Sequence, residues 1–260
     1  MRVSRRKFLK IAGISALGFS AIPAIDFLRR DELQASEVLP PPKALTAKRW
    51  AMVVNMRDMD EETARKCIEA CHRVHNVPDI GDPKREIKWI WTETFEHAFP
   101  GQGYEHIGED LKHKPFLVLC NHCDNPACVQ VCPTKATWKR EDGIVMMDQH
   151  RCIGCRFCMA ACPFGSRSFN WQDPWPRPFG KRPPNPEFPT RERGVVEKCN
   201  FCAERLAKGL MPACVEASNG ALIFGDVEDP DSEVRKILRS HYTIRRKPYL
   251  GTNPQIYYIV

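Results

Sequence analysis

One short run of cysteines constrains the fold of this chain more than any other feature of its sequence. The run ends in a proline and is spaced Cys152-x2-Cys155-x2-Cys158-x3-Cys162-Pro163. This spacing lets three cysteines surround one [4Fe–4S] cluster while the fourth reaches a neighbouring cluster. Because the cysteines lie so close together, the chain must form a tight loop whose backbone N–H groups point at the anionic cluster. A glycine, residue 154, lies within this loop and suits it.

A second run precedes the first and is spaced Cys120-x2-Cys123-x4-Cys128-x3-Cys132-Pro133. Two such runs are the pattern of bacterial ferredoxins, in which each fourth cysteine binds the cluster of the other run. Exchange of the fourth ligands therefore predicts two complete sites, here named clusters A and B. The ligands of cluster A are Cys120, Cys123, Cys128 and Cys162, and those of cluster B are Cys152, Cys155, Cys158 and Cys132.

Structural zinc and disulfides are the alternatives for these two runs. Zinc takes four ligands, usually from two separated Cys-x2–4-Cys pairs, and does not need the repeated cysteine–proline pattern. Disulfides would require no fixed spacing along the chain. The spacing therefore favours iron–sulfur clusters over both alternatives.

Further motifs lie outside the two runs. They are Phe169-Asn170-Trp171, Gly194-Val195-Val196-Glu197-Lys198-Cys199-x2-Cys202, Pro212-Ala213-Cys214, and Gly251-Thr252-Asn253-Pro254 before Tyr257-Tyr258. With these motifs, the chain from about residue 50 to its end resembles the iron–sulfur subunits of the dimethyl sulfoxide reductase family. The resemblance implies an α+β fold of two fused ferredoxin-like modules with exchanged cluster ligands, an N-terminal signal or anchor helix and extended loops. In that family four cysteine groups hold four clusters, and the first group pairs with the fourth.

The sequence departs from the family pattern in the first and fourth groups. The family positions of the first group fall at Glu61, Ala64, Cys67 and Cys71, and those of the fourth at Cys199, Cys202, Cys214 and Ser218. The resemblance thus implies a complete cluster C on Cys199, Cys202, Cys214 and Cys71. The remaining site would hold Glu61, Ala64, Cys67 and Ser218, and one thiolate cannot bind a cluster. We therefore predict three clusters and one vestigial site, with Cys67 as a small buried apolar side chain.

Side chains beside the predicted clusters are expected to be structural. His72 and His75 flank Cys71, and we expect each to hydrogen-bond to nearby backbone or solvent and not to bind a haem. We expect packing near the clusters, and no contact with a cofactor, for Trp89, Trp91 and Trp171.

The N-terminus has the features of a twin-arginine export signal. Arg5 and Arg6 precede Phe8, and the fifteen residues from Ile11 to Ile25 carry no charge. Because this route carries folded proteins, the cysteines would leave the cytoplasm already bound to clusters inserted there. They would then not form the disulfides that are usual outside the cytoplasm. We expect the protein at the extracytoplasmic face of the cell membrane, either peripheral or anchored by an uncleaved N-terminal helix.

The predicted organisation has three parts. These are the export signal at 1–25, a linker at 26–49 with three consecutive prolines, and an iron–sulfur domain at 50–260. Within the domain we expect an inner module at about 115–170, an outer module from 50–80 plus 195–226, a proline-rich loop at 173–190 and a C-terminal extension at 227–260. Strands are expected near 49–54, 143–146 and 221–224, a helix near 232–239, and a tail that ends at 256–260.

The charge of the chain argues against a nucleic-acid partner. The formal charge of +7 includes five basic residues and no acid in residues 1–24; without them, 34 Lys and Arg face 32 Asp and Glu, which leaves +2. Three clusters of charge about −2 each would bring the total to about −4. We therefore expect no nucleic-acid binding.

No residue pattern indicates bond-making catalysis, because the twelve predicted thiolates would saturate their clusters. The expected function is electron relay, with each potential set by burial, hydrogen bonds to sulfur and charge. The resemblance is strongest to the exported iron–sulfur subunit of Dsr/Hme-type menaquinol-oxidising membrane complexes of sulfate reducers. It implies two partners, an NrfD-type multi-helix quinone-interacting membrane subunit and a multihaem cytochrome c. Two alternatives are a relay subunit of a periplasmic molybdopterin reductase and a redox-sensing or structural metal protein.

Overall fold

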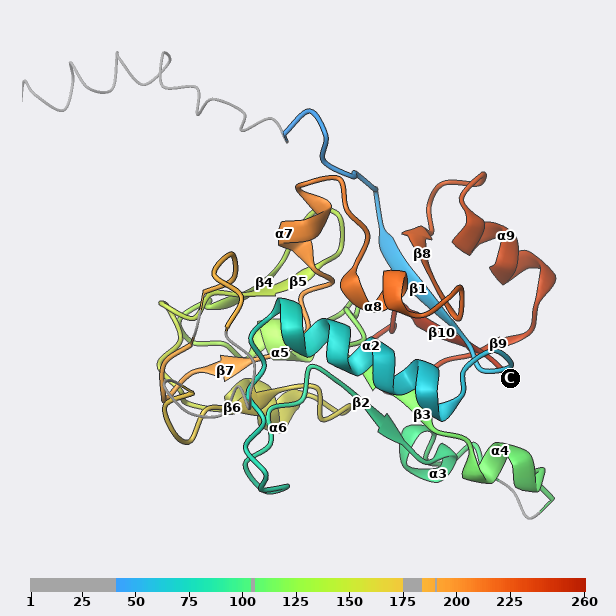
Figure 1. Ribbon diagram of the computed structural model, residues 1–260, viewed down its shortest axis with the longest axis horizontal. Coiled ribbons are helices and arrows are strands. Elements are labelled where there is room, and N and C mark those ends of the chain that lie inside the picture. Colours follow the sequence, from blue (N-terminus) through green and yellow to red (C-terminus); the bar gives the residue numbers. More distant parts are fainter. Residues whose placement is uncertain (1–40, 104–105, 175–183, 190) are drawn as a thin grey trace, which may run out of the picture. The chain divides into compact units, whose positions relative to one another are not determined.

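The computed structural model of the chain describes residues 41–103, 106–174, 184–189 and 191–260 (Figure 1). The predicted export signal with Arg5 and Arg6, and most of the predicted linker, lie outside these residues. None of the helices in the described ranges is long and apolar enough to cross a membrane. From Pro42 to Val260 the chain forms one unit.

Strands from the two ends of this unit form the main sheet (Figure 1). Their order is β8 (Leu222–Asp226), β1 (Trp50–Asn55), β10 (Ile256–Ile259) and β9 (Thr243–Ile244). Strand β1 runs parallel to β10 and antiparallel to β8. Its side chains alternate between two cores, as the twofold repeat of a strand requires: Met52 and Val54 face the main core, and Val53 faces the side covered by a helix.

That covering helix is α9 (Glu233–Ser240), which packs on β8 and β1. Ser232 caps it, because its hydroxyl accepts a 3.1 Å hydrogen bond from the Arg235 N–H. Val234, fully buried, is its main contact with the sheet.

Helix α2 (Glu61–Val74) lies on the other side of the unit and packs against α8 (Ala213–Ala217) (Figure 1). Asp60 caps it by accepting a 2.7 Å hydrogen bond from the Thr63 N–H. Its buried residues recur every three or four positions, at Ala64, Cys67, Ala70 and Cys71. One face of α2 is therefore buried, and this face carries the cysteines.

The rest of the unit consists of short hairpins and helices. The antiparallel pairs are β2 (Ile90–Glu93) with β3 (Phe116–Leu119), β4 (Thr137–Lys139) with β5 (Val145–Met147), and β6 (Ser168–Phe169) with β7 (Val196–Glu197). The short helices are α3 (Phe95–Ala98), α4 (Glu109–His113), α5 (Ala127–Gln130), α6 (Phe157–Ala161), α7 (Ala203–Leu206) and the 3-10 helix η2 (Pro248–Leu250). Helices α5 and α6 contact each other.

The elements expected from the sequence are largely present. Strands β1, β5 and β8 and helix α9 lie within two residues of the predicted ranges, and the predicted C-terminal tail contains strand β10. The described end of the proline-rich loop contains neither helix nor strand, and the Asn185 N–H donates to Asn76 Oδ1 at 2.6 Å beyond the end of α2. The last residues of the predicted linker already lie on the body, because the Leu45 N–H donates to the Leu206 carbonyl at 2.9 Å.

Candidate metal centres

Three Cys-x2-Cys loops share one backbone feature. The residue before the second cysteine has a φ of +40° at His122, +69° at Gly154 and +55° at Phe201. Successive N–H groups in such a loop converge on one point and form a concave site for an anion. At Gly154 a side chain is also excluded, because a Cβ would lie 2.3 Å from the Gly194 carbonyl oxygen. The tight loops predicted from the spacing are therefore present.

The four cysteines predicted for cluster C lie together and are all buried. Burial raises the pKa of the Cys71 thiol, and three neighbouring sulfurs raise it further, those of Cys199, Cys202 and Cys214. Helix α2 supplies Cys71, α8 supplies Cys214, and the loop between β7 and α7 supplies the other two. The contact between α2 and α8 thus brings the first and fourth cysteine groups together.

Backbone N–H groups already point at two of these sulfurs. The Phe201 N–H donates to Cys199 Sγ, and the Ala213 N–H donates to Cys202 Sγ, each at 3.4 Å. Four converging buried thiols with N–H donors fit the ligand shell of a [4Fe–4S] cluster, since such hydrogen bonds stabilise thiolate sulfur.

The cysteines predicted for cluster A also lie together. Burial is the main cause that raises the pKa of the Cys123 thiol to about 12. The neighbouring Cys120 raises this pKa further, and Cys162 and Cys128 do so more weakly. Cys162 comes from the end of the second run, so the exchange of fourth ligands has the geometry it needs for this site.

Two of the cysteines predicted for cluster B, the first and the third of the run at 152–162, lie near each other. Cys152 packs beside Cys158, and the Val196 N–H lies 3.5 Å from Cys152 Sγ. Cys155 belongs to the same loop, and Cys132 follows α5, the helix that contacts α6. Burial raises the pKa of Cys132, but hydrogen bonds from the backbone of Thr137, Ala136 and Thr134 and from the Thr134 hydroxyl outweigh it, so the pKa lies below its usual value.

All thirteen cysteines lie in described residues, and none forms a disulfide. The cysteines predicted for clusters A, B and C are here named sets A, B and C. The sets form a row, because Cys199 of set C lies near Cys120 of set A, and Cys128 of set A lies near Cys158 of set B. Set A is therefore between sets C and B.

The vestigial site is occupied by ordinary packing and hydrogen bonds. Helix α2 runs without interruption from Glu61, so positions 61–67 do not form a loop like the other three. Ala64 is buried, and Cys67 Sγ donates to the Cys214 carbonyl at 3.3 Å. The Ser218 hydroxyl donates to the Val215 carbonyl at 2.7 Å and accepts from the Leu222 N–H at 3.0 Å. Cys67 is fully buried, as predicted.

Cys67 should be chemically inert in the folded protein, because burial raises the pKa of its thiol to about 12. We expect iodoacetamide at neutral pH to leave Cys67 unmodified until the protein unfolds, as read by peptide mass mapping. We also expect Cys67→Ala to retain the full iron content. Loss of iron from this variant, or alkylation of native Cys67 at the rate of a free thiol, would contradict the interpretation.

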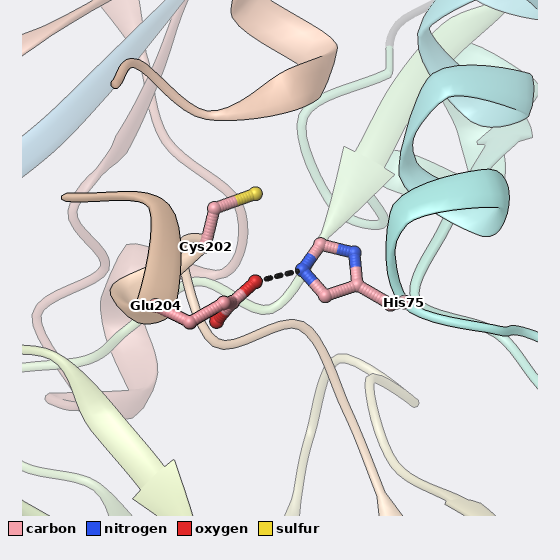
Figure 2. Close-up of side chains that lie close together, drawn as sticks. All are labelled: His75, Cys202 and Glu204. Atoms are coloured by element: carbon pink, nitrogen blue, oxygen red, sulfur yellow. Dashed lines mark hydrogen bonds and ion pairs between the residues drawn. The ribbon is translucent and has the colours of Figure 1, made fainter. Parts of the chain in front are cut away.

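His75 connects set C to a carboxylate (Figure 2). Its Nε2 lies 2.8 Å from a Glu204 carboxylate oxygen, and its Nδ1 lies 2.9 Å from the Cys71 carbonyl and 3.5 Å from Cys71 Sγ. The ring stacks on Trp89 at 4.5 Å. The expected backbone hydrogen bond is confirmed, and Glu204 is a partner that the sequence did not predict. Figure 2 also shows Cys202 near the ring, and we assign its sulfur to cluster C.

The remaining side chains expected beside the clusters are His72 and three tryptophans. Burial lowers the pKa of His72 to about 4, so this imidazole is neutral at physiological pH. Trp89 and Trp91 are buried, as expected. Trp171 also packs as expected, against Phe169 at 4.7 Å and Arg156 at 4.9 Å, although 48% of its surface is exposed.

Comparisons with known proteins agree with this arrangement. A model of the 4Fe-4S dicluster domain family matches residues 112–175, which contain both cysteine runs. The Hdr-like menaquinol oxidoreductase iron-sulfur subunit 1 of Archaeoglobus fulgidus is 37% identical, and the match covers 98% of this chain and 97% of that protein. The chain belongs to this family of iron–sulfur subunits.

Other relatives of this iron–sulfur subunit come from several oxidoreductases. The menaquinone reductase iron-sulfur cluster-binding subunit of Nitratidesulfovibrio vulgaris is 37% identical over 81% of this chain and 88% of its own length. A tetrathionate reductase subunit of Salmonella typhimurium is 32% identical over all of this chain and 89% of its own length. The family members are electron-transfer subunits and are not catalytic on their own, which confirms the expectation of a non-catalytic subunit.

The sequence did not reveal the buried charges of this iron–sulfur subunit. Arg191 and Glu197 form an ion pair at 2.6 Å with side chains 0% and 1% exposed. Lys198 and Arg167 are also buried. The family motif includes Glu197 and Lys198 but does not show that they are buried, and no sequence signal distinguishes Arg167 from the other basic residues.

Proposed function

We propose that this iron–sulfur subunit relays electrons through three [4Fe–4S] clusters between a quinone-interacting membrane subunit and an extracytoplasmic redox partner. The complex would oxidise menaquinol and serve sulfate or sulfite respiration. The observation that carries the proposal is the positive φ that recurs before the second cysteine of three loops, at His122, Gly154 and Phe201. Each of these loops begins a cysteine set. Clusters in the row C–A–B would give the electron a continuous path through the protein.

The proposed count of three clusters depends on the vestigial site, where the family pattern would hold a fourth cluster. Helix α2 replaces the loop that a further cluster would need, and Ser218 is engaged by backbone hydrogen bonds. Two fused ferredoxin-like modules with exchanged ligands account for this arrangement. The ligands of cluster A would come from the two cysteine runs of the inner module. The ligands of cluster C would connect α2 with α8 in the outer module.

Cluster B lies at the end of the row whose ligand loop carries the most exposed apolar side chains. Ile153 and Phe157 lie in its ligand loop and are 67% and 60% exposed, and Trp171 is close to the same loop through its contact with Arg156. Exposed apolar side chains that gather into a patch mark interaction surfaces, whereas single ones do not. We assign this surface, Ile153–Phe157–Trp171, to the NrfD-type membrane subunit.

Replacing Phe157 and Trp171 together with alanine should weaken association with the membrane subunit by at least tenfold, because aromatic anchors dominate interface energies. The measurement is recovery of the membrane subunit on the tagged iron–sulfur subunit, with iron per chain as a check on folding. Tyr242→Ala is the matched control, since Tyr242 is 80% exposed in the C-terminal extension. Unchanged recovery in the double variant would remove the assignment.

The other end of the row would meet the outer partner, and a multihaem cytochrome c is our first candidate. A molybdopterin reductase is the second, favoured by the match over the whole chain to a subunit of tetrathionate reductase. Co-purification of a haem protein supports the first candidate, and co-purification of a molybdopterin protein supports the second. Zinc in place of iron would favour a structural or sensing role.

Export by the twin-arginine route belongs to the same proposal. Arg5 and Arg6 would direct the folded subunit to the extracytoplasmic face of the membrane. N-terminal sequencing of the mature protein tests whether the segment stays as an anchor.

The function is tested by electron transfer from a reduced menaquinone analogue. We expect it to bleach the visible absorbance of the clusters when the membrane subunit is present and to leave the isolated iron–sulfur subunit oxidised. Bleaching that does not depend on the membrane subunit would contradict the proposed route.

A further inference from the structure

A buried guanidinium lies between the cysteine sets of clusters A and B. Arg167 is 5% exposed and is held by the β4–β5 hairpin. Its Nη2 donates to Thr137 Oγ1 at 2.8 Å, and its Nη1 lies 3.7 Å from Met147 Sδ. The buried Nε has no hydrogen-bond partner among the described residues.

Arg167 has no carboxylate partner within the part of the chain that the structure describes, whereas the equally buried Arg191 pairs with Glu197 at 2.6 Å. A buried charge without a counter-charge is costly, by several kcal/mol. Met147, which Arg167 contacts, packs against the core cluster that contains Cys128 and Cys158. The sulfurs beside Arg167 that would become anionic as cluster ligands thus belong to two sets, Cys120 and Cys128 of set A and Cys158 of set B. The counter-charge of Arg167 is therefore on the cluster ligands.

We propose that Arg167 is the shared counter-ion of clusters A and B and raises the reduction potentials of both. The proposal rests on the proposed function, because it requires both clusters to be bound. Reduction adds one electron to a cluster, so a fixed positive charge beside it stabilises the reduced form. The buried surroundings strengthen this interaction relative to water.

Cluster C has a different buried cation. Lys198 is 2% exposed, and its Nζ donates to the Cys199 carbonyl at 2.7 Å and to the Val145 carbonyl. Cys199 belongs to set C, so Lys198 acts on that cluster. Arg167 and Lys198 thus allow a paired comparison between a cation beside sets A and B and a cation bonded to the backbone of set C.

The test is an EPR-monitored redox titration of the iron-loaded subunit. Cys71→Ala identifies the signal of cluster C by its absence. We expect Arg167→Gln to lower the equilibrium constants for reduction of clusters A and B at least tenfold, which is about 59 mV for a one-electron couple. The potential of cluster C should not move. Arg167→Lys keeps the charge and should retain most of the native potentials. Lys198→Gln should lower the reduction potential of cluster C more than that of cluster B.

Unchanged potentials of A and B in a fully loaded Arg167→Gln protein would overturn the proposal, and so would an equal shift of all three clusters. If that variant loses iron, Thr137→Val provides the decision, because it removes only the hydroxyl that positions Nη2. A fall in the reduction potentials of clusters A and B in Thr137→Val, smaller than that expected for Arg167→Gln, supports the proposal. Unchanged potentials in Thr137→Val overturn it. Iron content and reversible reduction of the wild-type protein are measured first, so failure of the proposed function is seen separately.

Discussion

Replacing Cys71 with alanine should remove one cluster and leave the other two in place. Cys71 is the only predicted ligand of cluster C that comes from α2, and it lies beside Cys199, Cys202 and Cys214. Three thiolates cannot complete the ligand set of a [4Fe–4S] cluster that takes four. Iron per chain should fall from about twelve to about eight, with the loss of one EPR signal.

Cys67→Ala is the matched control, because Cys67 lies one helical turn before Cys71 on the same buried face. The control should retain all its iron. Full iron in Cys71→Ala, or equal losses in both variants, would show that the exchange of ligands between the first and fourth groups is wrong.

Replacing Glu197 with alanine should produce the largest loss of stability that does not involve a cluster ligand. The carboxylate of Glu197 pairs with Arg191, and it accepts hydrogen bonds of 2.6 Å from Trp89 Nε1 and Asn170 Nδ2. Removing it leaves a buried guanidinium without its counter-charge, at a cost of about 3–5 kcal/mol. The midpoint of thermal unfolding, followed by loss of cluster absorbance, should fall by roughly 10 °C.

Glu69→Ala is the comparison for this variant. Glu69 also pairs with an arginine, Arg65 at 2.7 Å, but both side chains are about half-exposed, at 47% and 59%. Exposed pairs contribute only about 0.2–1 kcal/mol, so the unfolding midpoint should fall by no more than a few degrees. Equal effects of the two substitutions would mean that the buried pair has no special role.

Cysteine spacing predicted the sites because it limits how a chain can surround a cluster. The spacing of Cys152 and Cys155 requires a reversal between them, and Gly154 supplies it with a φ of +69°. The same spacing at His122 and Phe201 gave no local signal, since neither residue favours positive φ. Their conformation follows from the loop and not from their own propensity.

The buried charges could not be predicted because burial depends on contacts between distant segments. Arg167 lies in a polar stretch that resembles an exposed loop, and only the approach of β4 and β5 encloses it. His75 likewise meets Glu204, 129 residues later in the chain. Cysteine spacing predicts the ligands of each site, whereas the charged neighbours of these ligands depend on the fold.

The central claim is that this polypeptide assembles three complete cysteine quartets. Iron and acid-labile sulfide analysis of the purified protein tests it directly. We expect about twelve iron atoms and about twelve sulfides per chain. About sixteen of each would mean that the α2 site binds a cluster after all, and about eight would mean that one predicted quartet does not.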